Sequence, residues 1–267
     1  MSSSLPSSSS PHSDLKPNSS AYEIRLQPVE NTATREEWVT ARKALLLKEK
    51  ALTKAADELA AQRRQLPHVK IDKTYTFEGP NGKVNFTDLF EGRKQLIIYH
   101  FMFPPPSTTG CVGCSFFTDN IPSHLQHLHS RNTTLVLVSR APYSAIAPFK
   151  KRMGWTVPWY SSFGSDFNYD FHATNDEAVT PMMANWESAE ALRERGKGGH
   201  VEGEQSGVSV FIEGRGGEVY HTYSAFARGI DVFLATNHFL DATPLGRQDG
   251  EGDKAFTWAY HDEYENN

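Results

Sequence analysis

Cysteine is scarce in this sequence, and long hydrophobic runs are missing. The 267 residues include two cysteines, too few for the many disulfides with which small secreted domains compensate for a small core. No apolar run approaches the roughly 18 residues of a membrane span, and the mean hydropathy is -0.53. The N-terminus also lacks the basic and apolar regions of a secretory signal peptide. We therefore expect a soluble, cytoplasmic protein without a membrane partner.

An excess of positive charge is also missing. The chain has 27 Lys and Arg against 32 Asp and Glu, for a formal net charge of -5. A basic patch is the electrostatic signature of a nucleic-acid-binding surface, and the compact basic run 150–152 is interpreted here as a solvated helix face. We expect no nucleic-acid partner. The hydrophobic content of 38% is enough for a globular core.

The chain divides by composition into a tail, a helix and a domain. Residues 1–33 begin with a Ser/Pro-rich stretch that cannot bury enough apolar surface to order itself, and we predict a disordered tail. A long helix is predicted over 34–66, because Thr34-Arg35-Glu36-Glu37 is typical of a helix start and apolar residues follow at helical spacing. Residues 67–267 are assigned to one domain with an insertion at about 171–206.

Within that domain, strand and helix patterns alternate. A buried strand, a helix, a second buried strand and a second helix follow one another, which predicts a parallel sheet with crossover helices. Hairpins are predicted on either side of this unit. The predicted elements are a hairpin at 73–86, strands at 95–103 and 133–139, helices running to 129 and over 141–154, a short helix near 186–195, a hairpin at 208–223 and a final helix at 230–240.

The two cysteines lie where the first buried strand gives way to a helix. Unpaired amides and the helix dipole at that position favour a thiolate on Cys111. Cys114, one helical turn later, can resolve a sulfenic acid or mixed disulfide formed on Cys111. The pattern predicts redox chemistry, and the alternatives are two inert buried thiols or half of a metal site.

The residues before Cys111 have the spacing of the peroxiredoxin signature. Pro104, Thr108 and Cys111 match Pro-x-x-x-Thr-x-x-Cys, in which the proline shields the cysteine and the hydroxyl orients a peroxide. An arginine is needed to stabilise the thiolate and polarise the peroxide. Arg140, after the second buried strand, is the candidate and Arg228 the second choice. A surface ion pair is the alternative role for each.

A metal centre formed by the two cysteines and by histidines is the alternative to redox chemistry. Two thiolates with one or two imidazoles would suit zinc or copper, so the candidate ligands are Cys111, Cys114, His100, His221 and His261. His221 and Tyr223 are two residues apart in a predicted strand, and we expect them on one face. No spacing rule unites these histidines, and a hydrogen-bonded core residue is the other interpretation of a strand histidine. The redox mechanism requires no cofactor.

A set of segments resembles the thioredoxin-like family catalogued as domain of unknown function 899, a distant relative of peroxiredoxins and thioredoxins. The segments together cover roughly residues 35–264 and are Tyr99–Phe103, Gly110–Phe116, Leu137–Pro142, Arg152–Trp155, Ser161–Asn168, Gly207–Phe211, His221–Ser224, Ala227–Gly229, Thr243–Arg247 and His261–Tyr264. The resemblance implies a thioredoxin-like, peroxiredoxin-like α/β fold, with a central mixed sheet flanked by helices and preceded by a long helix.

The resemblance leaves three functions open. The first is a thiol-dependent oxidoreductase that acts on a peroxide, a disulfide or another small molecule and is recycled by a thiol reductant. The second is a copper or zinc protein, and the third is a non-enzymatic redox sensor whose long helix docks a partner. Thioredoxins carry a cis-proline where this chain has Gly207-Val208-Ser209, which favours peroxide or small-molecule chemistry over general disulfide reduction. A homodimer is compatible with each function.

Overall fold

A computed structural model describes residues 31–181, 183–198, 201–249 and 258–264. The chain divides into two compact units, the first ending at Ala61 and the second beginning at Gln62. The predicted disordered tail, 1–33, lies outside the described residues except for its last three. No described helix is long and apolar enough to cross a membrane.

The described part of the first unit is mainly helix α1, Arg35–Arg63, whose last two residues belong to the second unit. Its start is a capping box, because Thr34 donates its amide to Glu37 Oε2 at 2.8 Å and Thr34 Oγ1 accepts the Glu37 amide at 3.3 Å. The helix has no buried residue. Its local stability therefore comes from this cap and from side-chain pairs such as Lys54 with Glu58. The prediction of a long N-terminal helix is confirmed.

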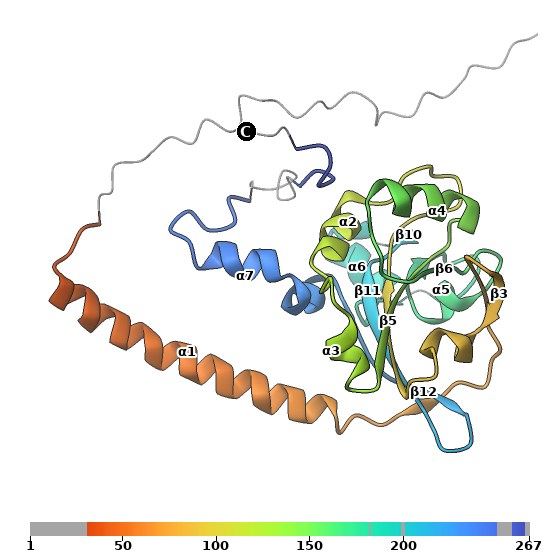
Figure 1. Ribbon diagram of the computed structural model, residues 1–267, viewed down its shortest axis with the longest axis horizontal. Helices are drawn as coiled ribbons and strands as arrows, with labels where there is room; N and C mark the ends of the chain where they lie inside the picture. Colours follow the sequence, from red (N-terminus) through yellow and green to blue (C-terminus); the bar gives the residue numbers. More distant parts are fainter. Residues whose placement is uncertain (1–30, 182, 199–200, 250–257, 265–267) are drawn as a thin grey trace, which may run out of the picture. The chain divides into compact units, whose positions relative to one another are not determined.

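An eight-stranded mixed sheet forms the centre of the second unit (Figure 1). Its spatial order is β1-β12-β11-β4-β5-β6-β2-β3. The pairs β4–β5 and β5–β6 are parallel and the others are antiparallel. The strands are β1 Val69–Lys70, β2 Thr76–Gly79, β3 Gly82–Asn85, β4 Gln95–His100, β5 Thr133–Ser139, β6 Trp159–Ser161, β11 Gly207–Glu213 and β12 Val219–Phe226.

The connections between these strands define the fold. Helix α2, Val112–Asp119, links β4 to β5, and α4, Tyr143–Arg152, links β5 to β6. Strands β11 and β12 form a hairpin that is followed by a 3-10 helix, η4, Ala227–Phe233, and by α7, Ala235–Asp241. A βαβ unit and a β-hairpin, paired in the order β12-β11-β4-β5, are the thioredoxin arrangement. The prediction of a thioredoxin-like fold is confirmed.

Each face of the sheet has its own apolar core. On one face, Tyr99 and Phe101 pack with residues of α2 and α4. On the other face, Leu96 and Ile98 pack against the 3-10 helix η2, Phe86–Phe90, and against α5, Phe167–Asp170. Side chains of a strand alternate between faces, so a strand between two cores is apolar throughout. This explains why the four residues between Gln95 and His100 in β4 are all aliphatic or aromatic.

Several predicted elements differ from the observed ones at prolines and at strand ends. The helix predicted to run to residue 129 is two helices, α2 and α3, Gln126–His129, because Pro122 disfavours helical backbone at the residue before it. The final predicted helix is likewise divided, into η4 and α7. Strand β4 ends three residues earlier than predicted, and the short strands β1 and β6 were not predicted.

The segment 171–206 contains short elements of its own. Its described residues form two small two-stranded sheets, β7 with β10 and β8 with β9, and a helix, α6, close to the predicted position. Ser188 caps that helix by accepting the Ala191 amide at 3.3 Å. The elements are β7 Thr174–Asn175, β8 Met183–Ala184, β9 Glu187–Ser188, α6 Ala189–Glu194 and β10 Gly203–Glu204.

Substitution of Gly207 tests how tightly the hairpin of β11 and β12 is packed. A Cβ at this position would lie 2.3 Å from Phe226 Cδ1 and 3.0 Å from the Ala225 carbonyl oxygen. We expect Gly207→Ala to lower the free energy of unfolding by about 1–3 kcal/mol, as overpacking does, measured by urea denaturation. Gly198→Ala is the control, because its Cβ would meet only Arg193 Cγ at 3.9 Å. Equal losses in both variants would contradict this packing.

Candidate active site

Cys111 is held at the start of α2 by backbone hydrogen bonds. It is the N-cap residue, with extended φ and ψ of -64° and 135°. Its amide donates to the Met102 carbonyl at 3.1 Å, and its carbonyl accepts both the amide and the hydroxyl of Ser115 at 2.9 Å. The half-buried thiol therefore lies beside the unpaired amides of the first helical turn.

These surroundings lower the pKa of Cys111 to about 6. The main cause is a hydrogen bond with the Cys114 thiol, and the amides of Cys114 and Gly113 lower the pKa further. Burial raises it, but less strongly than these hydrogen bonds lower it. Because hydrogen bonds to the charged form favour ionisation, Cys111 is mostly a thiolate at neutral pH, which is the nucleophilic form of the side chain.

The pKa of Cys114 is shifted in the opposite direction, upward. Its side chain is 1% exposed, and burial raises its pKa well above the usual value, as do the hydrogen bond with Cys111 and the charge there. Its sulfur accepts the Met102 amide at 3.3 Å and is also hydrogen-bonded to the Tyr99 hydroxyl. Both cysteines are free thiols in this structure. The pair thus consists of an accessible thiolate and a buried thiol that donates to it.

A small, mostly apolar cavity of about 270 Å³ opens at Cys111. It is lined by Met102, Cys111, Val112, Gly113, Cys114 and Ser206, so no lysine, arginine or histidine among the described residues lines it. Beside it, the Tyr99 and Phe117 rings stack at 3.7 Å between centroids and 5° between planes. The site therefore stabilises a thiolate by hydrogen bonds and not by a neighbouring cation.

The chain near its C-terminus supports the segment that leads into α2. The Tyr260 hydroxyl donates to the Gly110 carbonyl, and Trp258 stacks on Phe116 with 4.2 Å between ring centroids. Gly110 has no room for a side chain, because a Cβ there would lie 2.4 Å from Phe101. These contacts determine where Cys111 lies relative to the end of β4.

Neither predicted arginine lines the cavity at Cys111. Arg140 donates to Glu204 Oε1 at 2.9 Å and stacks over Tyr169. Arg228 is 84% exposed and forms an ion pair with Asp231. Thr108 is exposed and is also absent from the cavity wall. The peroxiredoxin-like spacing of the sequence thus does not bring a threonine and an arginine to the cavity.

The candidate metal ligands are not brought together. Because side chains alternate along β4, Tyr99 faces the cysteines whereas His100 packs on Phe167 in the core of the opposite face. His221 lies on that opposite face as well, and His261 Nδ1 lies 2.8 Å from Asp119 Oδ1. Within the described ranges, no group of three or more His, Cys, Asp or Glu side chains could hold a metal ion.

The expectation that His221 and Tyr223 share one face is wrong. The register between β11 and β12 shifts from Val210↔Tyr223 to Phe211↔His221, which leaves Thr222 as the extra residue of a β-bulge. His221 therefore contacts Phe211 in one core, whereas Tyr223 packs against the core of the other face. A one-residue shift reverses the face of every following side chain, and the sequence contains no local signal for it.

Three groups that surround the thiols were not predicted from the sequence. The Met102 amide, the Tyr99 hydroxyl and Ser206 contact Cys114 or each other. The position of Tyr99 on the same strand face as Phe101 was the available signal. Ser206 lies far from the cysteines in the sequence, so only the pairing of β11 with β4 brings it to the site.

The fold and the paired thiols define this chain as a thioredoxin-like protein. Residues 27–264 match the model of a family described as a bacterial protein of unknown function, DUF899, and the chain belongs to that family. This confirms the resemblance noted in the sequence. No curated protein matches the chain.

Several solved structures are similar to this chain. Xylella fastidiosa PrxQ, in a mutant form, is 14% identical, with 65% of this chain and 98% of that chain covered and a TM-score of 0.39. Peroxidoxin BcpB from Mycobacterium tuberculosis is 11% identical, with coverage of 64% and 94% and a TM-score of 0.39. A putative thiol:disulfide interchange protein, DsbE, from Chlorobium tepidum is 11% identical, with coverage of 65% and 94% and a TM-score of 0.36.

The lowered pKa of Cys111 predicts a pH profile for its alkylation. Iodoacetamide reacts with thiolates, so the rate at Cys111 should rise with pH and reach half its maximum near pH 6. In a Cys114→Ala variant the midpoint should move upward, because the largest cause of the lowered pKa is removed. Mass spectrometry of the alkylated peptide measures both rates. An unchanged midpoint in the variant would show that Cys114 does not stabilise the thiolate.

Proposed function

We propose that the protein is a thiol oxidoreductase in which Cys111 is the nucleophile and Cys114 the resolving residue. One observation carries this proposal: Cys111 is half-buried at the N-cap of α2, whereas Cys114, one helical turn later, is 1% exposed. The pKa is accordingly lowered at the accessible sulfur and raised at the buried one. An attacking thiol works best when its pKa is near the ambient pH. The buried thiol is protected until the first sulfur has reacted.

The reaction would proceed in two exchanges. The Cys111 thiolate attacks one sulfur of a small disulfide, an S–S bond forms to that sulfur, and the other half of the substrate leaves as a thiolate and is protonated. Cys114 then loses its proton and attacks the Cys111 sulfur, which releases the second thiol. The protein disulfide that results is two electrons more oxidised than the dithiol, and a thiol reductant restores the starting state.

The composition of the cavity favours a small disulfide over a peroxide as the substrate. Cleavage of a peroxide O–O bond requires stabilisation of the developing negative charge on oxygen. The cavity wall has no cationic side chain, and Arg140 is paired with Glu204. We therefore assign neither Arg140 nor Thr108 a role in the chemical step. The small, mostly apolar opening suits an uncharged substrate of few atoms.

Single-cysteine variants test the assigned roles. Reduced wild-type protein treated with bis(2-hydroxyethyl) disulfide should lose two hydrogens and carry no adduct in intact-mass spectra. Cys114→Ser should retain a mixed disulfide on Cys111, because no thiol remains to resolve it, whereas Cys111→Ser should react only at the background rate, since the raised pKa keeps Cys114 a thiol.

Thr108→Val is the matched control, because Thr108 is exposed outside the cavity, and its rate should stay close to that of the wild type. An adduct on Cys114 in the wild-type protein would reverse the assignment. Faster oxidation of the wild type by tert-butyl hydroperoxide than by the disulfide, at equal concentrations, would make a peroxide the better substrate.

A further inference from the structure

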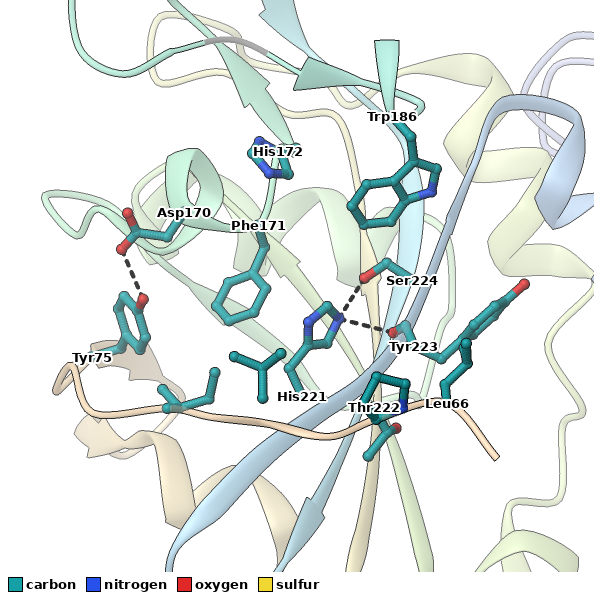
Figure 2. Close-up of a pocket in the computed structure, with 13 residues that line it drawn as sticks. Leu66, Tyr75, Asp170, Phe171, His172, Trp186, His221, Thr222, Tyr223 and Ser224 are labelled. Atoms are coloured by element: carbon teal, nitrogen blue, oxygen red, sulfur yellow. Dashed lines mark hydrogen bonds between the residues drawn. The ribbon is translucent and has the colours of Figure 1, made fainter. Parts of the chain in front are cut away.

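A second and larger cavity lies beside the edge of the sheet formed by β1 and β12. Its volume is about 600 Å³, within the range of small-molecule sites. Aromatic and imidazole rings line much of it, and Figure 2 shows Tyr75, Phe171, His172, Trp186 and His221 around it. Phe171 and His221 belong to the core on the face opposite the cysteines. The cavity is therefore separate from the dithiol.

The bulge at Thr222 determines how His221 lies in this cavity. It places His221 on the same face as Ser224, so that Nε2 lies 2.7 Å from Ser224 Oγ and 3.0 Å from the Tyr223 carbonyl oxygen. Because a carbonyl oxygen only accepts, Nε2 carries the proton. Burial lowers the pKa of His221, so the neutral ring leaves Nδ1 as an acceptor. No described residue donates to Nδ1, which lies on the side of Phe171 (Figure 2).

A buried chain of hydrogen bonds continues from His221 into the interior of the domain. Ser224 Oγ lies 2.8 Å from Ser209 Oγ, and Ser209 Oγ lies 2.8 Å from His100 Nε2. A proton on His100 Nε2, donated to Ser209, avoids an unpaired hydrogen on the buried Nδ1 of that ring. The tautomer of His221 does not depend on this chain, because the Tyr223 carbonyl accepts from Nε2 whichever hydroxyl donates.

The rim of the cavity carries large side chains at unusual backbone positions. Asn185 and Trp186 have φ values of 48° and 68° in the turn between β8 and β9, and His172 has a φ of 54°. Glycine or asparagine is the usual residue at such positions, and a bulky side chain there is strained. Yet Trp186 is 55% exposed and its ring contacts the His172 ring. Strained residues of this kind cluster at ligand sites.

We infer that this cavity binds a neutral, planar aromatic compound that donates an O–H or N–H hydrogen bond to His221 Nδ1 and packs against Trp186. The ring-lined walls supply apolar and aromatic contact. Asp170 is the one carboxylate that lines the cavity, and it already accepts from Lys73 and Tyr75, each at 2.7 Å. A cationic ligand would therefore find no free carboxylate in the wall, whereas a neutral donor finds the imidazole acceptor.

Two naphthalene probes that differ by one methyl group separate the hydrogen bond from simple apolar binding. We would titrate the reduced full chain with 2-naphthol and with 2-methoxynaphthalene, which lacks the hydroxyl hydrogen, by isothermal titration calorimetry. The expected result is saturable one-to-one binding of 2-naphthol, with a Kd at least about tenfold lower than that of the methoxy compound, because a buried acceptor discriminates against a ligand that leaves it unpaired. Equal binding of both probes, or no saturable binding, would overturn the inference.

Variants locate the probe. In His221→Phe the two probes should bind about equally, and Trp186→Gly should weaken both while relieving the positive φ. Phe239→Ala is the control, because Phe239 is a 77% exposed aromatic residue outside the cavity, and its Kd should not change. Binding should also persist in Cys111→Ser. Loss of binding in Cys111→Ser, or unchanged binding in Trp186→Gly, would place the probe elsewhere and refute the proposed site.

Discussion

The pairing of β4 between β11 and β5 is the constraint on which both cavities depend. β4 is antiparallel to β11 and parallel to β5, and its register determines which side chains face each core. Tyr99 is directed to the cysteines, whereas the next residue, His100, is directed to the hydroxyl chain that ends at His221. Since strand periodicity is two, a slip of one residue would exchange these environments and disrupt both sites.

Local sequence patterns were sufficient to predict the main elements and the dithiol. The Thr34–Glu37 capping box, the apolar run of β4 and the turns of both hairpins are short-range signals. Each is observed near its predicted place, with β4 three residues shorter than predicted. The placement of Cys111 at a helix start follows from the same kind of signal. Local patterns determine these features because the interactions that form them involve neighbouring residues.

Features that depend on distant pairing could not be predicted. The role of Arg140 was assigned from its place after β5, but its partner Glu204 is 64 positions away along the chain. The bulge at Thr222 depends on how β12 pairs with β11. The metal hypothesis grouped residues by type, whereas the sheet separates His100 and His221 from the cysteines. Residue type indicates which chemistry is available, and only the strand register decides which side chains meet.

The chemical asymmetry of the two thiols follows from the depth at which α2 begins. Cys111 lies at its half-buried start, where helix amides are available to a thiolate, whereas Cys114 lies one turn deeper against Tyr99. In a helix that began one turn earlier, Cys111 would no longer lie beside the unpaired amides of the first turn. The start of α2 is in turn determined by Gly110, which has no room for a Cβ beside Phe101 and whose carbonyl accepts from Tyr260. The reactivity of the pair is therefore a consequence of packing around the turn that precedes it.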